Sequence, residues 1–231
     1  SAIHGDFVSA AWAIMAAAVF DMLDGRVARL AKATSQFGVE YDSLSDLMSF
    51  GAAPALLLYQ WALQPFGRLG WLAAFLFLAC GALRLARFNV LSSVLPKNYF
   101  QGLPIPMAAG MVATFIIFVH EYALPADIQK WIVLLLTFGL ASLMVSTVRF
   151  PSFKELNWRS RGTFGFLMVG VLAMILVAAK PEIMLFALLS TYVVLSLAWN
   201  LVLLVKGTQE TAPTDRKHRV AVPEVETTEV S

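Results

Sequence analysis

Four aspartates near the start of the chain have the types and spacing of a chemical site. Asp21 and Asp24 lie three residues apart, and Asp42 and Asp46 lie four apart, in stretches that predict helix. At about 100° per residue, the two carboxylates of each pair fall within about 60° of one another on one helix face. Ionisable groups in apolar helices are costly and usually functional. The two pairs are therefore our candidate site.

Carboxylates that converge in this way repel one another unless positive charge offsets them. Oxygen ligands suit Mg²⁺ or Mn²⁺, and two such ions about 3.5–4 Å apart are suited to phosphoryl transfer. We therefore expect two divalent cations, bound by all four aspartates. Arg29, on the face of the first pair, adds a charge that can bind phosphate, and Gly25 leaves space for a bulky group. Plain interfacial anchoring is the alternative, and it suits one isolated aspartate better than four at these spacings.

The helices that must position these residues belong to a chain suited to a membrane. Its 231 residues are 59% hydrophobic and 14% charged, with a mean hydropathy of +0.73, whereas soluble domains are about 45–50% apolar and about 25% charged. A soluble helical bundle would also show polar helix faces, which these runs lack. We therefore expect an all-α integral membrane protein, a polytopic helical bundle. Seven runs are long enough to cross a hydrocarbon core of about 30 Å: 7–31, 47–67, 69–91, 103–120, 131–148, 162–179 and 183–205.

The basic residues predict the orientation of these spans. If the N-terminus lies outside, 14 of the 17 basic residues fall on the cytoplasmic side, and only Arg68, Lys130 and Lys180 fall outside. By the positive-inside rule, the aspartates then lie at the cytoplasmic face of a bacterial-type inner or plasma membrane. After Val205 the sequence becomes polar and lacks aromatic residues. We therefore divide the chain into a transmembrane domain at 1–206 and a disordered cytoplasmic tail at 207–231.

The aspartates belong to a longer motif that matches a known family. From Asp21 to Asp46 the chain reads D-x2-D-G-x2-A-R-x8-G-x3-D-x3-D. This pattern resembles, at every fixed position, the signature of the CDP-alcohol phosphotransferases. Members of that family transfer a phosphatidyl or phosphoalcohol group from a CDP-linked donor to an acceptor hydroxyl and release CMP. The resemblance implies the same chemistry here.

The resemblance also implies a role for each aspartate. Asp21 and Asp42 would bridge both metal ions, Asp24 would complete the site of one ion, and Asp46 would complete the site of the other. Asp46 would in addition be the catalytic base that accepts the proton of the acceptor hydroxyl. A carboxylate beside two cations can stay ionised at neutral pH, which is compatible with that role.

Substrate and partner expectations follow from the same resemblance. Gly25, Arg29 and Ser35 would contact the CDP part of CDP-diacylglycerol. Members of the family usually have one more helix before the helix with the first two aspartates, so we expect eight spans in the full protein. A homodimer surrounded by membrane lipids is implied, and no nucleic-acid partner is expected.

The aspartate motif does not choose the acceptor, but the surrounding sequence favours one. Residues 41–59, 81–90 and 100–110 resemble the branch of the family that uses L-serine. A group near a predicted helix end could bind the serine carboxylate, namely Arg84, Arg87 and Asn89. Membrane anchoring explains the two arginines equally well. The alternatives are another acceptor, such as glycerol 3-phosphate or inositol phosphate, and, remotely, a cation transporter, which would place its carboxylates near the bilayer midplane.

Overall fold

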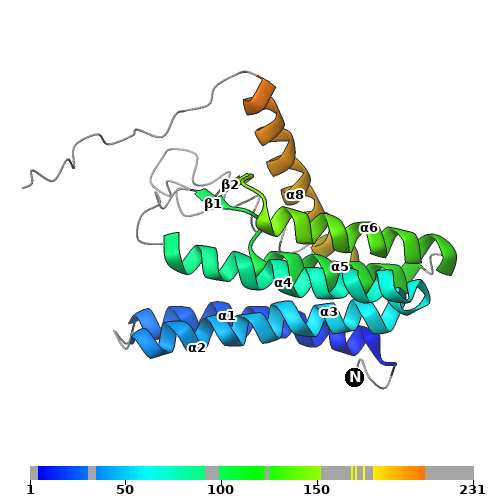
Figure 1. Ribbon diagram of the computed structural model, residues 1–231, viewed down its shortest axis with the longest axis horizontal. Coiled ribbons are helices and arrows are strands. Elements are labelled where there is room, and N and C mark those ends of the chain that lie inside the picture. The colour runs from blue at the N-terminus through cyan, green and yellow to red at the C-terminus, as the bar shows by residue number, and fades with distance from the viewer. Residues whose placement is uncertain are drawn as a thin grey trace, which may run out of the picture.

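The structure, a computed structural model, describes residues 5–30, 35–91, 99–122, 125–151, 168, 170, 174 and 179–205. Within these ranges the chain is almost entirely helical, so the expected helical bundle is confirmed (Figure 1). The α-helices are α1 (Phe7–Leu30), α2 (Gln36–Asp46), α3 (Ala53–Leu58), α4 (Arg68–Leu91), α5 (Ile105–Tyr122), α6 (Ala126–Val145) and α8 (Pro181–Val205).

Five of the described helices are long and apolar enough to cross a membrane. These segments are Phe7–Asp24, Arg68–Val90, Ile105–Tyr122, Asp127–Val145 and Pro181–Val202. The span expected at 47–67 is helical, but wider turns divide it. The span expected at 162–179 and the tail expected at 207–231 lie largely or wholly outside the described residues. The count of seven spans is therefore not confirmed.

The helical segment that begins with α2 continues directly into α3 and beyond it. π-helical turns at Leu47–Ala52 and Tyr59–Leu63 flank α3, and a 3₁₀ turn at Gln64–Phe66 ends the segment. Pro54 and Pro65 explain the wide turns, because proline has no N–H for the carbonyl four residues earlier and its ring crowds that carbonyl. The segment is therefore continuous but not uniformly wound.

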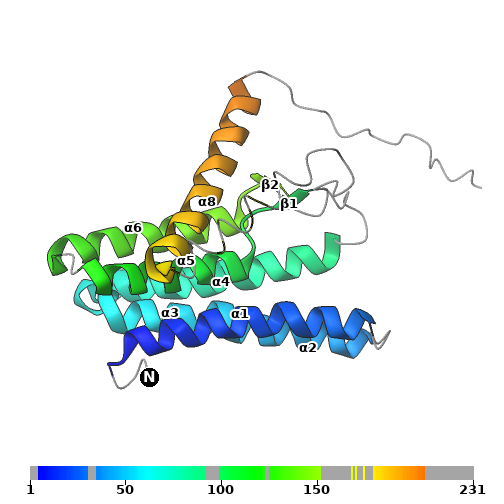
Figure 2. The same ribbon diagram turned by 180° about the vertical axis from the view of Figure 1, so that it is seen from behind.

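α5 lies at the centre of the bundle. Inside the molecule 67% of its span is buried, against 11% for the spans of α1 and α8. It packs against α1 on one side and α8 on another, as the two opposite views show (Figures 1 and 2). A Cβ atom at Gly110 would lie 3.3 Å from Leu189 Cδ1, so this glycine permits the close approach of α8. Small residues at such positions let helices pack closely within a membrane.

A short two-stranded ribbon, not expected from the sequence, joins two loops at one end of the bundle. Strand β1 (Tyr99–Gln101) pairs antiparallel with strand β2 (Arg149–Pro151). The residue after β1 is Gly102, which has a φ of +76°, and its N–H donates to the Val148 carbonyl at 2.9 Å. A side chain at Gly102 would collide with the Met144 carbonyl. Glycine is therefore needed where the loop before α5 contacts the end of α6.

Candidate active site

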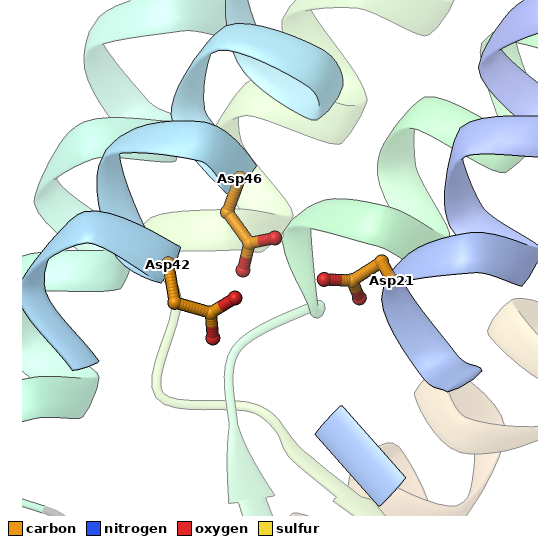
Figure 3. Close-up of side chains that lie close together, drawn as sticks. All are labelled: Asp21, Asp42 and Asp46. Carbon is orange, nitrogen blue, oxygen red and sulfur yellow. The ribbon is translucent and has the colours of Figure 1, made fainter. Parts of the chain in front are cut away.

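Three of the four aspartates converge between α1 and α2. One carboxylate oxygen from each of Asp21, Asp42 and Asp46 lies within 4.8 Å of the other two. Figure 3 shows Asp21 reaching from α1 toward Asp42 and Asp46, which come from successive turns of α2. Asp21 and Asp46 are partly buried, whereas Asp42 is exposed. The group is thus partly buried at Asp21 and Asp46 and exposed at Asp42.

Below the carboxylates, the π turn that follows α2 packs against α4. Asp46 directly precedes the first π turn, and one turn further Phe50 is fully buried. A Cβ atom at the neighbouring Gly51 would lie 3.1 Å from Leu78 Cδ1 of α4. Because Gly51 has no side chain, α4 approaches closely here, and fewer than two turns later it brings Arg84 to Asp46.

The three carboxylates form a donor set that fits a hard divalent cation. They offer several oxygen atoms in a small volume, which is the ligand type that Mg²⁺ and Mn²⁺ prefer. Without a cation, three ionised carboxylates at this separation repel one another, and partial burial of two of them adds a desolvation cost. The arrangement therefore suits a bound cation better than it suits a bare acidic cluster.

Asp24 does not join this group. It is exposed on α1 and lies outside the three carboxylates, although its charge acts on Asp21. Gly25 and Arg29 lie in the last turns of α1, and their side chains are outside the described part of the structure. Ser35 is the N-cap of α2, and its Oγ accepts a hydrogen bond from the Gly38 N–H at 3.0 Å. The predicted contacts of these residues with a metal ion or with CDP stay predictions.

Arg84 supplies a buried positive charge next to the carboxylates. Its side chain lies on α4, is 8% exposed, and acts electrostatically on Asp46. The Nε–H group donates to no acceptor among the described residues. The guanidinium carbon lies 5.5 Å from the centre of the Phe88 ring. Among the described residues, no carboxylate forms an ion pair with Arg84. A buried guanidinium with a spare N–H is suited to binding an anion.

Arg87 and Asn89 point elsewhere, so the three residues predicted as one acceptor-binding group diverge. Arg87 Nη1 donates to the carbonyls of Val145 and Ser146, at 3.3 and 3.5 Å, where α6 ends. A cation at a helix C-terminus is stabilised by the unpaired carbonyls there. Asn89 Nδ2 donates to Ser43 Oγ of α2 at 3.0 Å. Sequence reasoning missed Ser43, whose only signal was its place between Asp42 and Asp46.

The comparison with known protein families agrees with this geometry. A family model described as CDP-alcohol phosphatidyltransferase matches residues 1–148, which include every residue of the site. The chain belongs to this family. The resemblance inferred from the aspartate motif is therefore confirmed, and the apolar helices together with the family fit an integral membrane protein.

Three curated relatives carry the same name. A protein from Helicobacter pylori, named CDP-diacylglycerol–serine O-phosphatidyltransferase, is 41% identical over 152 residues, covering 66% of this chain and 64% of its own. Proteins of the same name from Bacillus subtilis and Methanocaldococcus jannaschii are 39% and 40% identical, covering 67% and 58% of this chain and 81% and 60% of their own. The match with the Helicobacter protein thus spans slightly less than two thirds of that protein's length.

Proposed function

We propose that this protein transfers a phosphatidyl group from CDP-diacylglycerol to the hydroxyl of L-serine, giving phosphatidylserine and CMP. The observation that supports this most directly is the convergence of Asp21, Asp42 and Asp46 beside the buried Arg84. The curated names of the relatives favour serine as the acceptor. We place the reaction at the cytoplasmic face of a bacterial-type membrane, where the basic residues are concentrated.

In the proposed reaction the serine oxygen forms a bond with the β-phosphorus of CDP-diacylglycerol. The bond between that phosphorus and the bridging oxygen of the diphosphate breaks, and CMP leaves with the bridging oxygen. Asp46 accepts the proton of the serine hydroxyl, and its partial burial next to Arg84 supports this role. Holding the hydroxyl in line with the diphosphate contributes through orientation.

Two divalent cations, Mg²⁺ or Mn²⁺, complete this proposal. Asp21, Asp42 and Asp46 would hold them, with Asp24 as a fourth ligand, and bound cations would offset the negative charge of the diphosphate. Arg29, Gly25 and Ser35 remain the residues proposed to contact the CDP part. We also propose that the protein forms a homodimer, as the family resemblance implies.

Arg84 is the residue we propose to bind the serine carboxylate. It is buried, charged and close to Asp46, and its Nε–H lacks a described acceptor. The same properties would suit the phosphate of glycerol 3-phosphate, which is the alternative acceptor. Only the acceptor, and not the donor or the reaction type, differs between these two proposals.

The direct test supplies purified protein with CDP-diacylglycerol, Mn²⁺ or Mg²⁺ and one acceptor at a time, and measures CMP release. We expect release with L-serine and little release with glycerol 3-phosphate or inositol phosphate. Release with glycerol 3-phosphate but not with serine would overturn the serine assignment. Absence of metal-dependent CMP release with every acceptor, from folded protein, would overturn the phosphatidyl transfer itself.

Asp46→Asn tests the proposed base. Removing a general base lowers turnover by about 10²–10⁴-fold, whereas binding of CDP-diacylglycerol, followed by equilibrium binding in detergent, should change little. Asp127→Asn is the matched control, because Asp127 is 97% exposed at the start of α6 and pairs only with Lys130 among the described ion pairs. Equal loss of binding and turnover in Asp46→Asn would instead make Asp46 mainly a metal ligand.

A further inference from the structure

One polar contact joins α2 to α4 at the level of the carboxylates. Asn89 Nδ2 of α4 donates to Ser43 Oγ at 3.0 Å, and Ser43 Oγ in turn donates to the Val39 carbonyl at 3.1 Å. Both side chains are partly buried, whereas residues 37–42 of the same helix are exposed. The contact therefore lies where α2 begins to leave the packed bundle.

The position of Ser43 around the helix suits it to fix the rotation of α2. At about 100° per residue, Ser43 lies about 100° from Asp42 and about 60° from Asp46 around the helix axis. A hydrogen bond at this angle resists rotation of α2 about its own axis without occupying the face that carries the carboxylates. Side-chain tips lie about 5–6 Å from a helix axis, so a rotation of about 20° would move a carboxylate by about 2 Å.

Such a displacement is large for a metal ligand. Mg²⁺ accepts little deviation from octahedral geometry at about 2.0–2.1 Å from each oxygen. A movement of about 2 Å would therefore remove Asp42 or Asp46 from a coordination shell shared with Asp21, which belongs to a different helix.

We propose that Asn89 is a positioning residue, which through Ser43 holds the carboxylates of α2 opposite Asp21 and so sets the affinity for the divalent cation. Asn89 does not contact the acceptor. The inference rests on the proposed function only in taking the three aspartates as metal ligands. It differs from the sequence-based expectation, which grouped Asn89 with the arginines as an acceptor-binding residue.

The test measures Mn²⁺ binding to purified protein by electron paramagnetic resonance, without substrate, for Asn89→Ala, Ser43→Ala and the double variant. Loss of residues that orient metal ligands typically weakens metal binding by about 10–100-fold. We expect about tenfold weaker binding in each single variant, and no further loss in the double variant, because each change removes the hydrogen bond between Asn89 and Ser43. Ser43→Thr, which keeps the hydroxyl, should retain Mn²⁺ binding. At saturating Mn²⁺, the KM for serine should stay unchanged in Asn89→Ala.

Matched controls separate this effect from a general loss of structure. Asn200→Ala removes an asparagine whose Nδ2 donates to the Ser196 carbonyl within α8, and Ser142→Ala removes a serine whose Oγ donates to the Phe138 carbonyl within α6. Neither should change Mn²⁺ binding. Each variant is also checked for its thermal unfolding midpoint. If Asn89→Ala unfolds, Asn89→Leu replaces it, because leucine keeps the size of the side chain but cannot donate to Ser43 Oγ.

Three outcomes would overturn parts of the proposal separately. Additive losses of Mn²⁺ affinity in the double variant would show that Asn89 and Ser43 act independently. A raised KM for serine in Asn89→Ala, with unchanged Mn²⁺ binding, would make Asn89 an acceptor contact. If the wild-type protein bound no Mn²⁺, or bound it equally in Asp42→Asn, the metal site itself would fail, and with it the mechanism proposed above.

Discussion

The two halves of the helical segment from Gln36 to Leu63 differ in how deeply their side chains are buried. Before Leu47 nearly every described side chain is exposed, and this half carries Asp42 and Asp46. After Leu47 the segment is packed into the bundle, with Phe50 and Leu58 almost fully buried. One continuous helical segment thus carries the candidate site at its exposed end and belongs to the core at its other end.

This difference indicates that the stability of the fold and the geometry of the site depend on separate contacts. The buried half is held by close packing against α4, which Gly51 allows. The exposed half makes polar contacts instead, namely the cap at Ser35 and the hydrogen bond between Asn89 and Ser43. Substitutions in the two halves should therefore separate stability from metal binding and turnover.

The largest expected effect comes from the exposed half. Asp42→Asn removes a charged oxygen ligand, so turnover and Mn²⁺ affinity should each fall by at least about 100-fold, the upper end of the losses seen for residues that only support metal ligands. The thermal unfolding midpoint in the absence of metal should hold or rise, because one repelling charge is gone. The measurements are CMP release, Mn²⁺ titration and thermal unfolding in detergent. A lower midpoint without metal would break the separation between the two halves.

A change in the buried half should show the reverse pattern. Phe50→Ala leaves a cavity in the core beside the π turn and should lower stability by about 2–4 kcal/mol, somewhat less than in a water-soluble core because the unfolded chain in a membrane also has apolar surroundings. Met48→Ala in the same π turn is the control, since Met48 is 65% exposed. Thermal unfolding and the KM for serine are measured together. A KM change in Phe50→Ala as large as its stability loss would contradict the comparison.

The smallest effect is expected at the start of α2. Ser35→Ala removes the N-cap and should destabilise the first turn by about 1 kcal/mol, seen as faster amide exchange over residues 36–40. Ser35→Asp distinguishes a capping role from a CDP contact, because aspartate also caps a helix but would repel a phosphate. If Ser35→Asp restores slow exchange and leaves the KM for CDP-diacylglycerol unchanged, Ser35 acts as a cap. A KM that rises in both variants would support the predicted CDP contact.

The sequence predicted the parts of the site that depend on local helical spacing. Asp21, Asp42 and Asp46 could be placed together because helix geometry and the family motif agree on them. The divergence of Arg84 and Arg87 was not predictable in this way. Residues three apart share a helix face, but long side chains reach in different directions when their neighbours differ, here Asp46 and the end of α6.

The fold was predictable to a similar extent, and the expectations that failed did so for similar reasons. Apolar length identified the helices, whereas the wide turns depend on what prolines at positions 54 and 65 do to carbonyl groups one turn earlier. The pairing of β1 with β2 joins residues about fifty positions apart, and no short-range pattern reports it. Asp24 shows the same limit, since its spacing is right but its side chain lies outside the group of three.

The π turn at Leu47–Ala52 sets the number of residues between the carboxylates of α2 and the buried core. A π turn contains about one residue more than the α turn it replaces, and each residue advances a helix by about 100°. Deleting one residue there would let the turn close to an α turn with every apolar side chain after it still in place. All residues before it, Asp42 and Asp46 included, would then rotate by about a quarter of a revolution away from Asp21. The number of residues between the carboxylates and the core is therefore as important for the site as the identity of those residues.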